Sequence, residues 1–594
     1  MQPIADYGLV GDTRTAALVS SDGSVDWLCV PRFDSAPIFG RLVGGPAAGR
    51  FRLGPAATPT VVARNYRHHT ATLETTWITP GGKLTLTEAM VAEVGGRLLP
   101  ATVLVRRLSA VGGSVDAVVE FDPRRGEQHR EPRIRHRGQD LVCQWGALAI
   151  SLSCDPGPAI EPGRPTHFTV TPDRPVTFVL TVAYREPLIH VQAAAAWALL
   201  VEDEGRWRDW TARVDQDLPF REEVIRSLLT LRLLTYSPSG APVAAPTTSL
   251  PEQRGGVRNF DYRFAWPRDA SIGIVAFLSV GMVEEARGFL WWLLHASRLQ
   301  RPRLPVLLTL DGRQAPPERG LRDWPGYVGS VPVRVGNGAA QQHQLDGYGW
   351  ILNAAWTLVQ AGHPLYGETW RAMQGFADLV ARRWSQPDAG IWEVRGDQVH
   401  HVHSKLMAWL ALDRALRIAE THRLSTGRRQ RWQAARRAIG IEVKNLGFDT
   451  SMGSYTRSYR SQELDAALLI LPQIGVEERG SPRTRGTLDA IRKQLSAGGP
   501  LLYRYPPGRD GLPGTEGAFL PCSFWLVEAL ALDDRRREAL ELFADLLGRA
   551  SPLGLYAEEM DPATGEYLGN YPQALTHAAL VQAALALRDL PSVS

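Results

Sequence analysis

The chain has 594 residues, of which 44% are hydrophobic, so it is long enough for two domains or for one large architecture. Its net charge of +4 includes no dense basic cluster, which argues against nucleic acid as a partner. No apolar run reaches the ~18 residues of a membrane span, and the start MQPIADYGLV lacks a secretory signal. Four cysteines without metal-ligand spacing look like free thiols, so we expect a cytoplasmic protein: Cys29, Cys143, Cys154 and Cys522.

Residues 1–190 alternate short apolar and polar runs with turn signals. TLETTWITPGGKLTLTEAM (72–90) indicates two strands around Pro-Gly-Gly, and TVLVRRLSAVGGSVDAVVEF (102–121) repeats the pattern around Gly-Gly. HFTVTPDRPVTFVLTVAY (167–184) repeats it once more. Hairpin signals at this regular spacing predict an N-terminal antiparallel β-sandwich.

From residue 191 the period of the apolar residues becomes helical. Residues 191–220 indicate a long linker helix, and residues 221–594 contain twelve further helical segments. Links after the even-numbered segments are short, whereas those after the odd-numbered segments are long and rich in aromatic and polar residues. Six antiparallel helix pairs with one elaborated end predict an (α/α)6 barrel; an irregular helical domain or a helical solenoid is the alternative. The segments are 221–237, 268–281, 283–298, 340–362, 365–384, 401–421, 426–446, 460–472, 482–496, 518–532, 534–548 and 572–589.

Five long links carry the clusters of Trp, Tyr, Arg, Asp and Glu. If consecutive helices run antiparallel, these links lie at one end of the barrel and line one funnel. Aromatic rings stack on sugar faces and charged planar groups bind hydroxyls, so such a pocket suits a carbohydrate. The clusters lie in residues 259–269, 322–339, 388–401, 501–519 and 554–573.

Glu393 in GIWEVRG and Glu558 in YAEEMD are candidates for acid/base chemistry. Glycoside hydrolysis needs one protonated carboxylic acid for the leaving oxygen and a second carboxylate that activates water or attacks the sugar. The indole of Trp392 beside Glu393 would reduce its solvation and raise its pKa. Alternatively, Glu393 is a loop carboxylate paired with Arg395, and Glu558 belongs to a solvated acidic turn.

Other polar residues in these links also have structural interpretations. Asp269 would complement a helix start, Arg268 would form a surface ion pair, and Lys405 would be a solvated helix residue. Three histidines resemble a metal cluster, but no cysteine or further histidine is placed to complete it, so we expect no metal: His400, His401 and His403.

Several long motifs follow one another along the chain: IADYGLVGDTRTAALVSSDGSVDWLCVPRFDS, TTSLPEQRGGVRNFDYRFAWPRDAS, GIWEVRG, HSKLMAWLALDRA, GTEGAFLPCSFWLVEALAL and LGLYAEEMDPATGEYLGNYPQALTHAAL. In sequence and order they resemble the motifs of glycoside hydrolase family 15, the glucoamylase family, in its bacterial branch, which also contains trehalases. The resemblance covers nearly the whole chain.

This resemblance implies a β-sandwich packed on an (α/α)6 barrel and an inverting mechanism without metal or other cofactor. It implies that Glu393 is the general acid and Glu558 the general base. Arg268 and Asp269 would bind the hydroxyls of the glucose unit, and further contacts to the sugar or the water would come from Tyr262, Trp266, Trp392, Arg504, Glu559 and Lys405.

Two segments depart from the family pattern, which leaves the linkage open. QLDGYGWILNA (344–354) has Trp350 where the bacterial pattern has an acidic residue, and loop 299–339 is unusual; both should affect the aglycone side. The main hypothesis is an exo-acting hydrolase releasing β-glucose from small α-glucosides or oligosaccharides. The alternatives are an α,α-trehalase, an inverting disaccharide phosphorylase and a non-catalytic sugar-binding protein. A homo-oligomer stays open.

Overall fold

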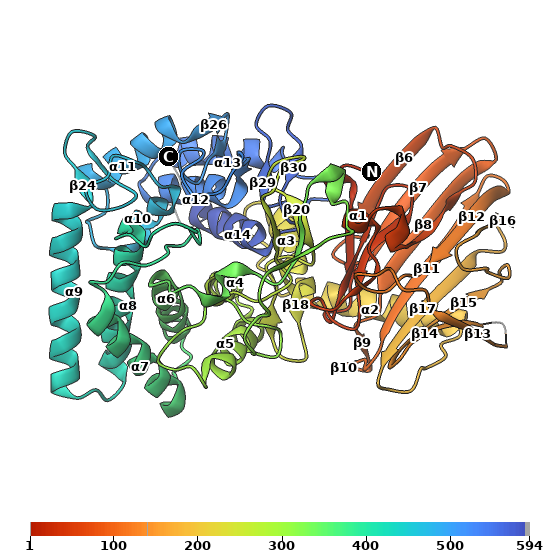
Figure 1. The fold of residues 1–594 in the computed structure, drawn as a ribbon, viewed down its shortest axis with the longest axis horizontal. Helices are drawn as coiled ribbons and strands as arrows, with labels where there is room; N and C mark the ends of the chain where they lie inside the picture. Colours follow the sequence, from red (N-terminus) through yellow and green to blue (C-terminus); the bar gives the residue numbers. More distant parts are fainter. Residues whose placement is uncertain (1, 139, 589–594) are drawn as a thin grey trace.

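The computed structural model describes residues 2–138 and 140–588. Strands fill most of residues 8–184, and helices dominate from residue 193 onward, as the change of period predicts (Figure 1). The limits 1–190, 191–220 and 221–594 stay predictions as domain boundaries. Residues 589–594, which include the last residue of the predicted segment 572–589, lie outside the described residues.

Two antiparallel sheets form the predicted β-sandwich in the described part of the chain. Alternation places Trp77 in the core, and Thr79 pairs with Gly82 across the predicted Pro-Gly turn. One sheet contains β1 (Gly8–Gly11), β2 (Ala16–Val19), β3 (Ser24–Cys29), β4 (Pro37–Phe39), β5 (Arg50–Pro55), β12 (Val115–Asp122) and β16 (Pro165–Val170). The other contains, in spatial order, β13 (Arg133–Arg137), β14 (Asp140–Trp145), β15 (Leu148–Asp155), β17 (Val176–Tyr184), β11 (Thr102–Val111), β8 (Gly82–Met90), β7 (Leu73–Thr79) and β6 (Val61–Tyr66).

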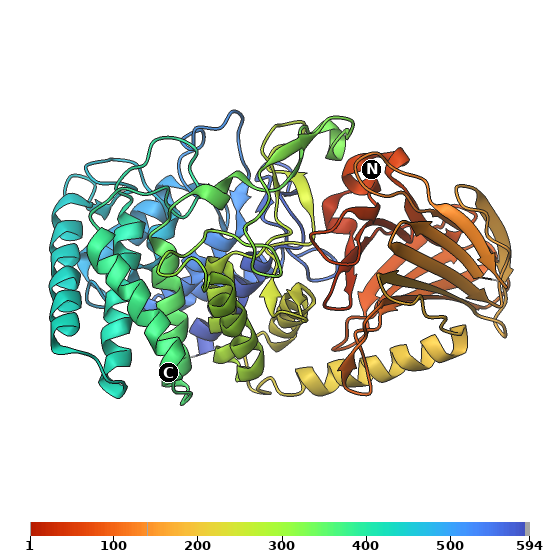
Figure 2. The same ribbon diagram turned by 60° about the horizontal axis from the view of Figure 1, so that its bottom comes forward.

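The predicted linker helix is α2 (Ala193–Thr211), which runs along the sandwich toward the helical region (Figure 2). Ala196 and Leu200 on α2 pack against Val105 and Val179 of the larger sheet, which explains why the helix lies on it. At the far end of α2, the indole of Trp210 donates a hydrogen bond of 2.5 Å to the carboxylate of Glu285 in the helical region.

Twelve α-helices follow between residues 221 and 588, arranged as an (α/α)6 barrel in this described range (Figure 1). Each inner helix packs against the next, and the last packs against the first, which closes the ring. Burial separates the layers, since α12 buries 11 of 13 residues and α9 only 4 of 21. The inner helices are α4 (Pro267–Ser279), α6 (Asp346–Gln360), α8 (Val402–Thr421), α10 (Leu471–Ile474), α12 (Leu520–Leu532) and α14 (Ala574–Arg588). The outer ones are α3 (Arg221–Leu233), α5 (Val283–Ser297), α7 (Gly367–Arg383), α9 (Thr426–Leu446), α11 (Pro482–Gln494) and α13 (Arg536–Leu547).

Two of the predicted segments are shorter in the structure. The segment predicted at 340–362 becomes helical only at Asp346, because residues 338–341 form a separate 3-10 turn, η4 (Gly338–Gln341). The segment predicted at 460–472 begins at η5 (Ala466–Ile470), where the carboxylate of Asp465 accepts a hydrogen bond from the N–H of Ala467, and continues as α10.

The long links all precede inner helices, so they meet at the N-terminal ends of the inner ring. The sandwich contacts the first of them: the indole of Trp27 donates to the carbonyl of Pro246 over 2.8 Å, and Arg263 donates to the carbonyl of Ser35 over 3.0 Å.

Among the described residues, every helix is too short or too polar to span a membrane.

Candidate active site

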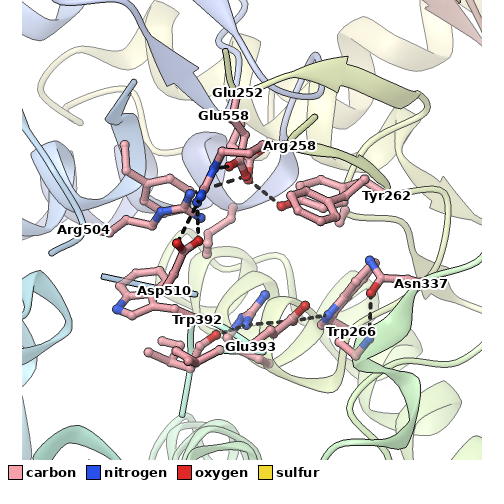
Figure 3. Close-up of a pocket in the computed structure, with 18 of the residues that line it drawn as sticks. Glu252, Arg258, Tyr262, Trp266, Asn337, Trp392, Glu393, Arg504, Asp510 and Glu558 are labelled. Carbon is pink, nitrogen blue, oxygen red and sulfur yellow. Dashed lines mark hydrogen bonds and ion pairs between the residues drawn. The ribbon is translucent and has the colours of Figure 1, made fainter. Parts of the chain in front are cut away.

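A cavity lies where the long links meet at the N-terminal ends of the inner helices. Figure 3 shows Glu393 and Glu558 on opposite sides of this cavity, with Tyr262 and Trp266 at one edge. The lining therefore comes from links far apart in the sequence, as predicted. It includes Glu252, Arg258, Phe260, Tyr262, Trp266, Arg268, Asp269, Asn337, Ala339, Trp392, Glu393, Arg395, Arg504, Asp510, Glu558 and Gln573.

Glu393 lies on the turn between α7 and α8 in a left-handed backbone conformation, with φ of 59°. Such a conformation costs a non-glycine residue energy and is found at functional sites. The indole of Trp266 donates to its carboxylate over 2.7 Å, and the guanidinium of Arg268 lies 3.6 Å away. Burial raises the pKa of Glu393, and Arg268 and the Trp266 indole oppose this shift.

The indole that hydrogen-bonds Glu393 is not that of its neighbour in the sequence. Trp392 does line the cavity, but its indole donates to Asp465 over 2.8 Å and not to Glu393. The indole bonded to Glu393 belongs to Trp266, the residue before α4. Arg395 is likewise not the partner of Glu393, because its guanidinium binds both carboxylate oxygens of Glu318 over 3.0 and 2.7 Å.

Arg268 and Asp269 occupy the first turn of α4 and point into the same cavity as the two glutamates. Their side chains form an ion pair of 2.7 Å, and Arg268 also donates to the carbonyl of Ile391 over 2.9 Å. Burial and these fixed partners hold both groups in one orientation. Such preorganised charged groups can bind sugar hydroxyls.

Glu558 is held from two sides. The hydroxyl of Tyr262 donates to Oε1 over 2.5 Å, and the N–H of Asn570 lies 3.4 Å from Oε2. The close approach requires Gly569, which has a left-handed backbone; a Cβ there would lie 2.6 Å from Oε2. Burial and the neighbouring Glu252 raise the pKa of Glu558 to about 8.

Arg504 lies behind Glu558 at the centre of three buried carboxylates. Its guanidinium binds Glu559 over 2.9 Å, Glu252 over 3.3 Å and Glu516 more closely. Oxygens of these carboxylates lie within 4.8 Å of one another, a spacing that would suit a metal ion. In this structure the guanidinium itself lies among them and supplies the positive charge, so the residues fit an arginine better than a metal.

Sequence reasoning missed several charged residues of this cluster. Arg258 binds Glu252 over 2.8 Å and Glu516 over 2.9 Å, and it also pairs with Asp510. Glu252 and Arg258 lie in the quoted motif TTSLPEQRGGVRNF, and Asp510 and Glu516 in the 501–519 link. The sequence feature that could have identified these residues is their position in the long links that carry the other candidate site residues.

Three residues that were predicted to contact the substrate or to influence its binding do not line the cavity. Lys405 is fully buried on α8 and donates from its ammonium to the carbonyls of Trp384 and Gln386, at the end of α7. Glu559 is buried behind Arg504, so it would act on sugar or water only through that residue. Trp350 donates to Asp346 over 3.2 Å and is not among the residues that line the cavity.

Two carboxyl groups face each other across the cavity: the partly buried Glu393 beside an indole and an arginine, and the fully buried Glu558 beside a tyrosine. Such a pair can transfer protons on both faces of a bound sugar. Together with the (α/α)6 barrel, this site defines an enzyme of the glycoside hydrolase class.

Comparison with known proteins gives the family. A family model described as glycosyl hydrolases family 15 matches residues 219–585, and one described as trehalase-like, N-terminal matches residues 1–158. The chain belongs to glycosyl hydrolase family 15.

Curated relatives and a solved structure match along nearly the whole chain. A trehalase of Mycolicibacterium smegmatis is 36% identical over 98% of this chain and 90% of its own length. A trehalase of Thermoplasma volcanium is 33% identical over 98% of this chain and 93% of its own length. The crystal structure of a bacterial glucoamylase complexed with acarbose superposes with a TM-score of 0.71 at 14% identity, covering 99% of this chain and 94% of that one. At that identity the match supports the fold alone.

Proposed function

We propose that this glycoside hydrolase is an α,α-trehalase, which hydrolyses the α,α-1,1 bond of trehalose to give two molecules of glucose. The observation that carries this proposal is the match over 98% of the chain to relatives named trehalase at up to 36% identity. The trehalase-like N-terminal match supports it independently of the catalytic region. The trehalase alternative is therefore better supported than the main hypothesis of the sequence analysis, a glucoamylase-like enzyme.

In this proposal Glu393 is the general acid. It donates a proton to the glycosidic oxygen as the bond to the first glucose breaks, so the second glucose leaves as a neutral alcohol. Burial favours the protonated form, which is the state that an acid needs at neutral pH. The hydrogen bond from Trp266 fixes the carboxyl orientation and stabilises the carboxylate that remains after the proton is transferred.

Glu558 is the general base in the same mechanism. It removes a proton from a water molecule that attacks the anomeric carbon from the face opposite the leaving group, which inverts the configuration. Tyr262 and the N–H of Asn570 donate to Glu558 and favour its ionised form. A proton held by the surrounding carboxyl cluster can lie on Glu516 or Glu559, whose pKa values burial raises, and leave Glu558 charged.

Two sets of polar groups would bind the two glucose units. Arg268 and Asp269, together with the rings of Tyr262 and Trp392, would hold the glucose whose bond is cleaved. Trehalose presents a second glucose with its own ring of hydroxyls, so the aglycone side must also be polar. Arg258, Asp510, Asn337 and Arg395 line the cavity and are the groups available for it.

The test is a substrate panel followed by analysis of the anomers released. We expect trehalose to be hydrolysed with a higher kcat/KM than maltose or isomaltose, without any requirement for inorganic phosphate. Early NMR spectra should show equal amounts of β-glucose and α-glucose, because inversion changes only the glucose that water attacks. Only α-glucose at early times would indicate retention, and a preference for maltose would contradict the proposed substrate.

A further inference from the structure

A second cluster of ionisable side chains lies far from the cavity, where the hairpin between β6 and β7 meets the first turn of α3. His68 and His69 lie at the tip of this hairpin, and Glu222 is the second residue of α3. The two imidazole rings stack with their centroids 3.6 Å apart. Both Nε2 atoms approach the same carboxylate of Glu222.

The ligand atoms have the separation that a tetrahedral metal site requires. His69 Nε2 lies 3.1 and 3.0 Å from the two oxygens of Glu222, and His68 Nε2 lies 3.8 Å from Oε2. With zinc bonds of about 2.0–2.2 Å to nitrogen and oxygen, the edges of a tetrahedron are about 3.3–3.5 Å long. The observed separations bracket this value. Because the two rings are stacked with 24° between their planes, binding also requires the exposed ring of His68 to rotate until its Nε2 faces the ion.

The backbone explains how two adjacent histidines can face one group. Successive residues of an extended strand point to opposite faces, which would separate the rings. His69 instead has φ of 56°, in the left-handed region that a non-glycine residue seldom adopts. The turn is closed by a hydrogen bond of 2.9 Å from the N–H of Arg67 to the carbonyl of Thr72. The strained conformation turns both imidazoles to the side of Glu222.

We propose that His68, His69 and Glu222 form a binding site for a divalent transition-metal ion such as Zn²⁺. Two imidazole nitrogens and one carboxylate form a ligand set that suits zinc, with the fourth position open to water. Hard cations such as Mg²⁺ prefer all-oxygen ligands, so they should bind poorly here. The site is separate from the cavity and independent of the proposed reaction.

The ion would join the sandwich to the helical barrel. The turn already contacts α3 one helical turn further on, where Arg226 donates to the carbonyl of Thr70 over 3.0 Å. Arg221 lies 3.4 Å from Glu222, so a cation must displace this contact or share the carboxylate. The side chain of His69 is only 13% exposed, whereas His68 and Glu222 are largely exposed, so an ion can enter from solvent without opening the fold.

Calorimetric titration of metal-free protein with Zn²⁺ tests the proposal. We expect one site per chain in the wild type, and binding at least ~10-fold weaker in His69→Ala and Glu222→Gln. Glu223→Gln is the matched control, because Glu223 is also exposed in the first turn of α3 but is not part of the cluster. His136→Ala, at an exposed position on β13, controls for binding by surface histidines in general.

Thermal unfolding with and without Zn²⁺ is the second measurement. A bound ion should raise Tm in the wild type and in both controls as the Zn²⁺ concentration increases, and not in Glu222→Gln. If His69→Ala does not fold in EDTA, His68→Ala and Glu222→Gln change only exposed side chains and replace it. Unchanged zinc affinity in these variants, or a response to Mg²⁺ equal to that with Zn²⁺, would overturn the proposal.

Discussion

Glu393 and Glu558 face the same cavity from surroundings that differ in charge. Next to Glu393 lie the indole of Trp266 and the guanidinium of Arg268, whose own ion-pair partner is Asp269. Around Glu558, two guanidinium groups are shared by five carboxyl groups, so full ionisation would leave three uncompensated negative charges (five minus two). These groups are Arg258, Arg504, Glu252, Asp510, Glu516, Glu558 and Glu559.

This difference shows that the raised pKa values of Glu393 and Glu558 have different causes. For Glu393 the cause is burial, which the neighbouring positive charge partly offsets. For Glu558 burial acts together with the negative charge of Glu252. The proposed acid is therefore tuned by solvation, and the proposed base by the proton content of its neighbours Glu516 and Glu559.

The largest expected effect comes from removing either carboxyl group. Glu393→Gln and Glu558→Gln should each lower kcat on trehalose by at least ~10²-fold, because each loses a proton-transfer group. Initial rates measured by glucose release check this. Glu368→Gln is the control, since its side chain is 91% exposed on α7 and should leave the rate unchanged.

The rates of the same two variants on α-glucosyl fluoride distinguish the roles of the two glutamates, because the leaving group of this substrate needs little protonation. Glu393→Gln should recover part of the lost rate on this substrate, whereas Glu558→Gln should stay slow because water still needs a base. If both variants recover equally, the two sides of the cavity do not have the distinct roles proposed.

Asp269→Asn should have the next largest effect. In the proposed function Asp269 helps to hold the glucose whose bond is cleaved, so kcat/KM should fall on every α-glucoside tested. The loss of a hydrogen bond to a charged group corresponds to roughly 10–100-fold. The measurement is kcat/KM on trehalose and on α-glucosyl fluoride. Wild-type values would show that Asp269 only complements the start of α4.

Glu252→Gln tests the cluster through the pH dependence of kcat/KM. Glu558 must be ionised to act, so activity rises with pH through its pKa and the acidic limb of the profile reports that value. Removing the negative charge of Glu252 lowers the pKa of Glu558, so the acidic limb should move to lower pH by roughly 1 unit. The basic limb, which reports loss of the Glu393 proton, should stay in place. An unmoved acidic limb would mean that Glu252 does not tune the base.

Much of the fold could be predicted because local patterns determine it. The hairpin around Pro80-Gly81 and the helical periods after residue 191 depend on neighbouring residues alone. The short helix at Ala466–Ile474 was harder, since its start depends on the cap formed by Asp465. The start of α6 at Asp346 was missed because the preceding 3-10 turn has a composition compatible with a helix.

The sequence identified the residues of the site better than the hydrogen bonds between them. Resemblance and link composition identified Glu393, Glu558 and Arg268, all of which line the cavity. Which indole bonds Glu393 depends on how two links meet, a long-range contact that no local pattern encodes. For the same reason the sequence could not reveal that Lys405 caps the end of a neighbouring helix.

The smallest effect is expected at the rim, where loop 299–339 meets the link that carries the acid. The ion pair between Glu318 and Arg395 connects the two segments, and the guanidinium of Arg395 also lies 5.3 Å from the ring of Phe260. Just after this loop, Gln342 donates to the carbonyl of Glu393 over 3.1 Å. Arg395 and Phe260 line the cavity, so this contact can act on the aglycone without touching Arg268 or Asp269.

Glu318→Gln should therefore change specificity more than rate. A partly exposed ion pair contributes about 0.2–1 kcal/mol, so the ratio of kcat/KM for trehalose to that for maltose should change by roughly 1.5–5-fold. α-Glucosyl fluoride lacks a sugar aglycone, and its hydrolysis should stay near the wild-type rate. Arg319→Gln is a matched control, because Arg319 lies in the same loop but pairs with Glu127 of the sandwich. An equal loss on all three substrates would mean that the ion pair supports the acid side itself, and the aglycone preference would then have to come from Arg258 and Asp510 across the cavity.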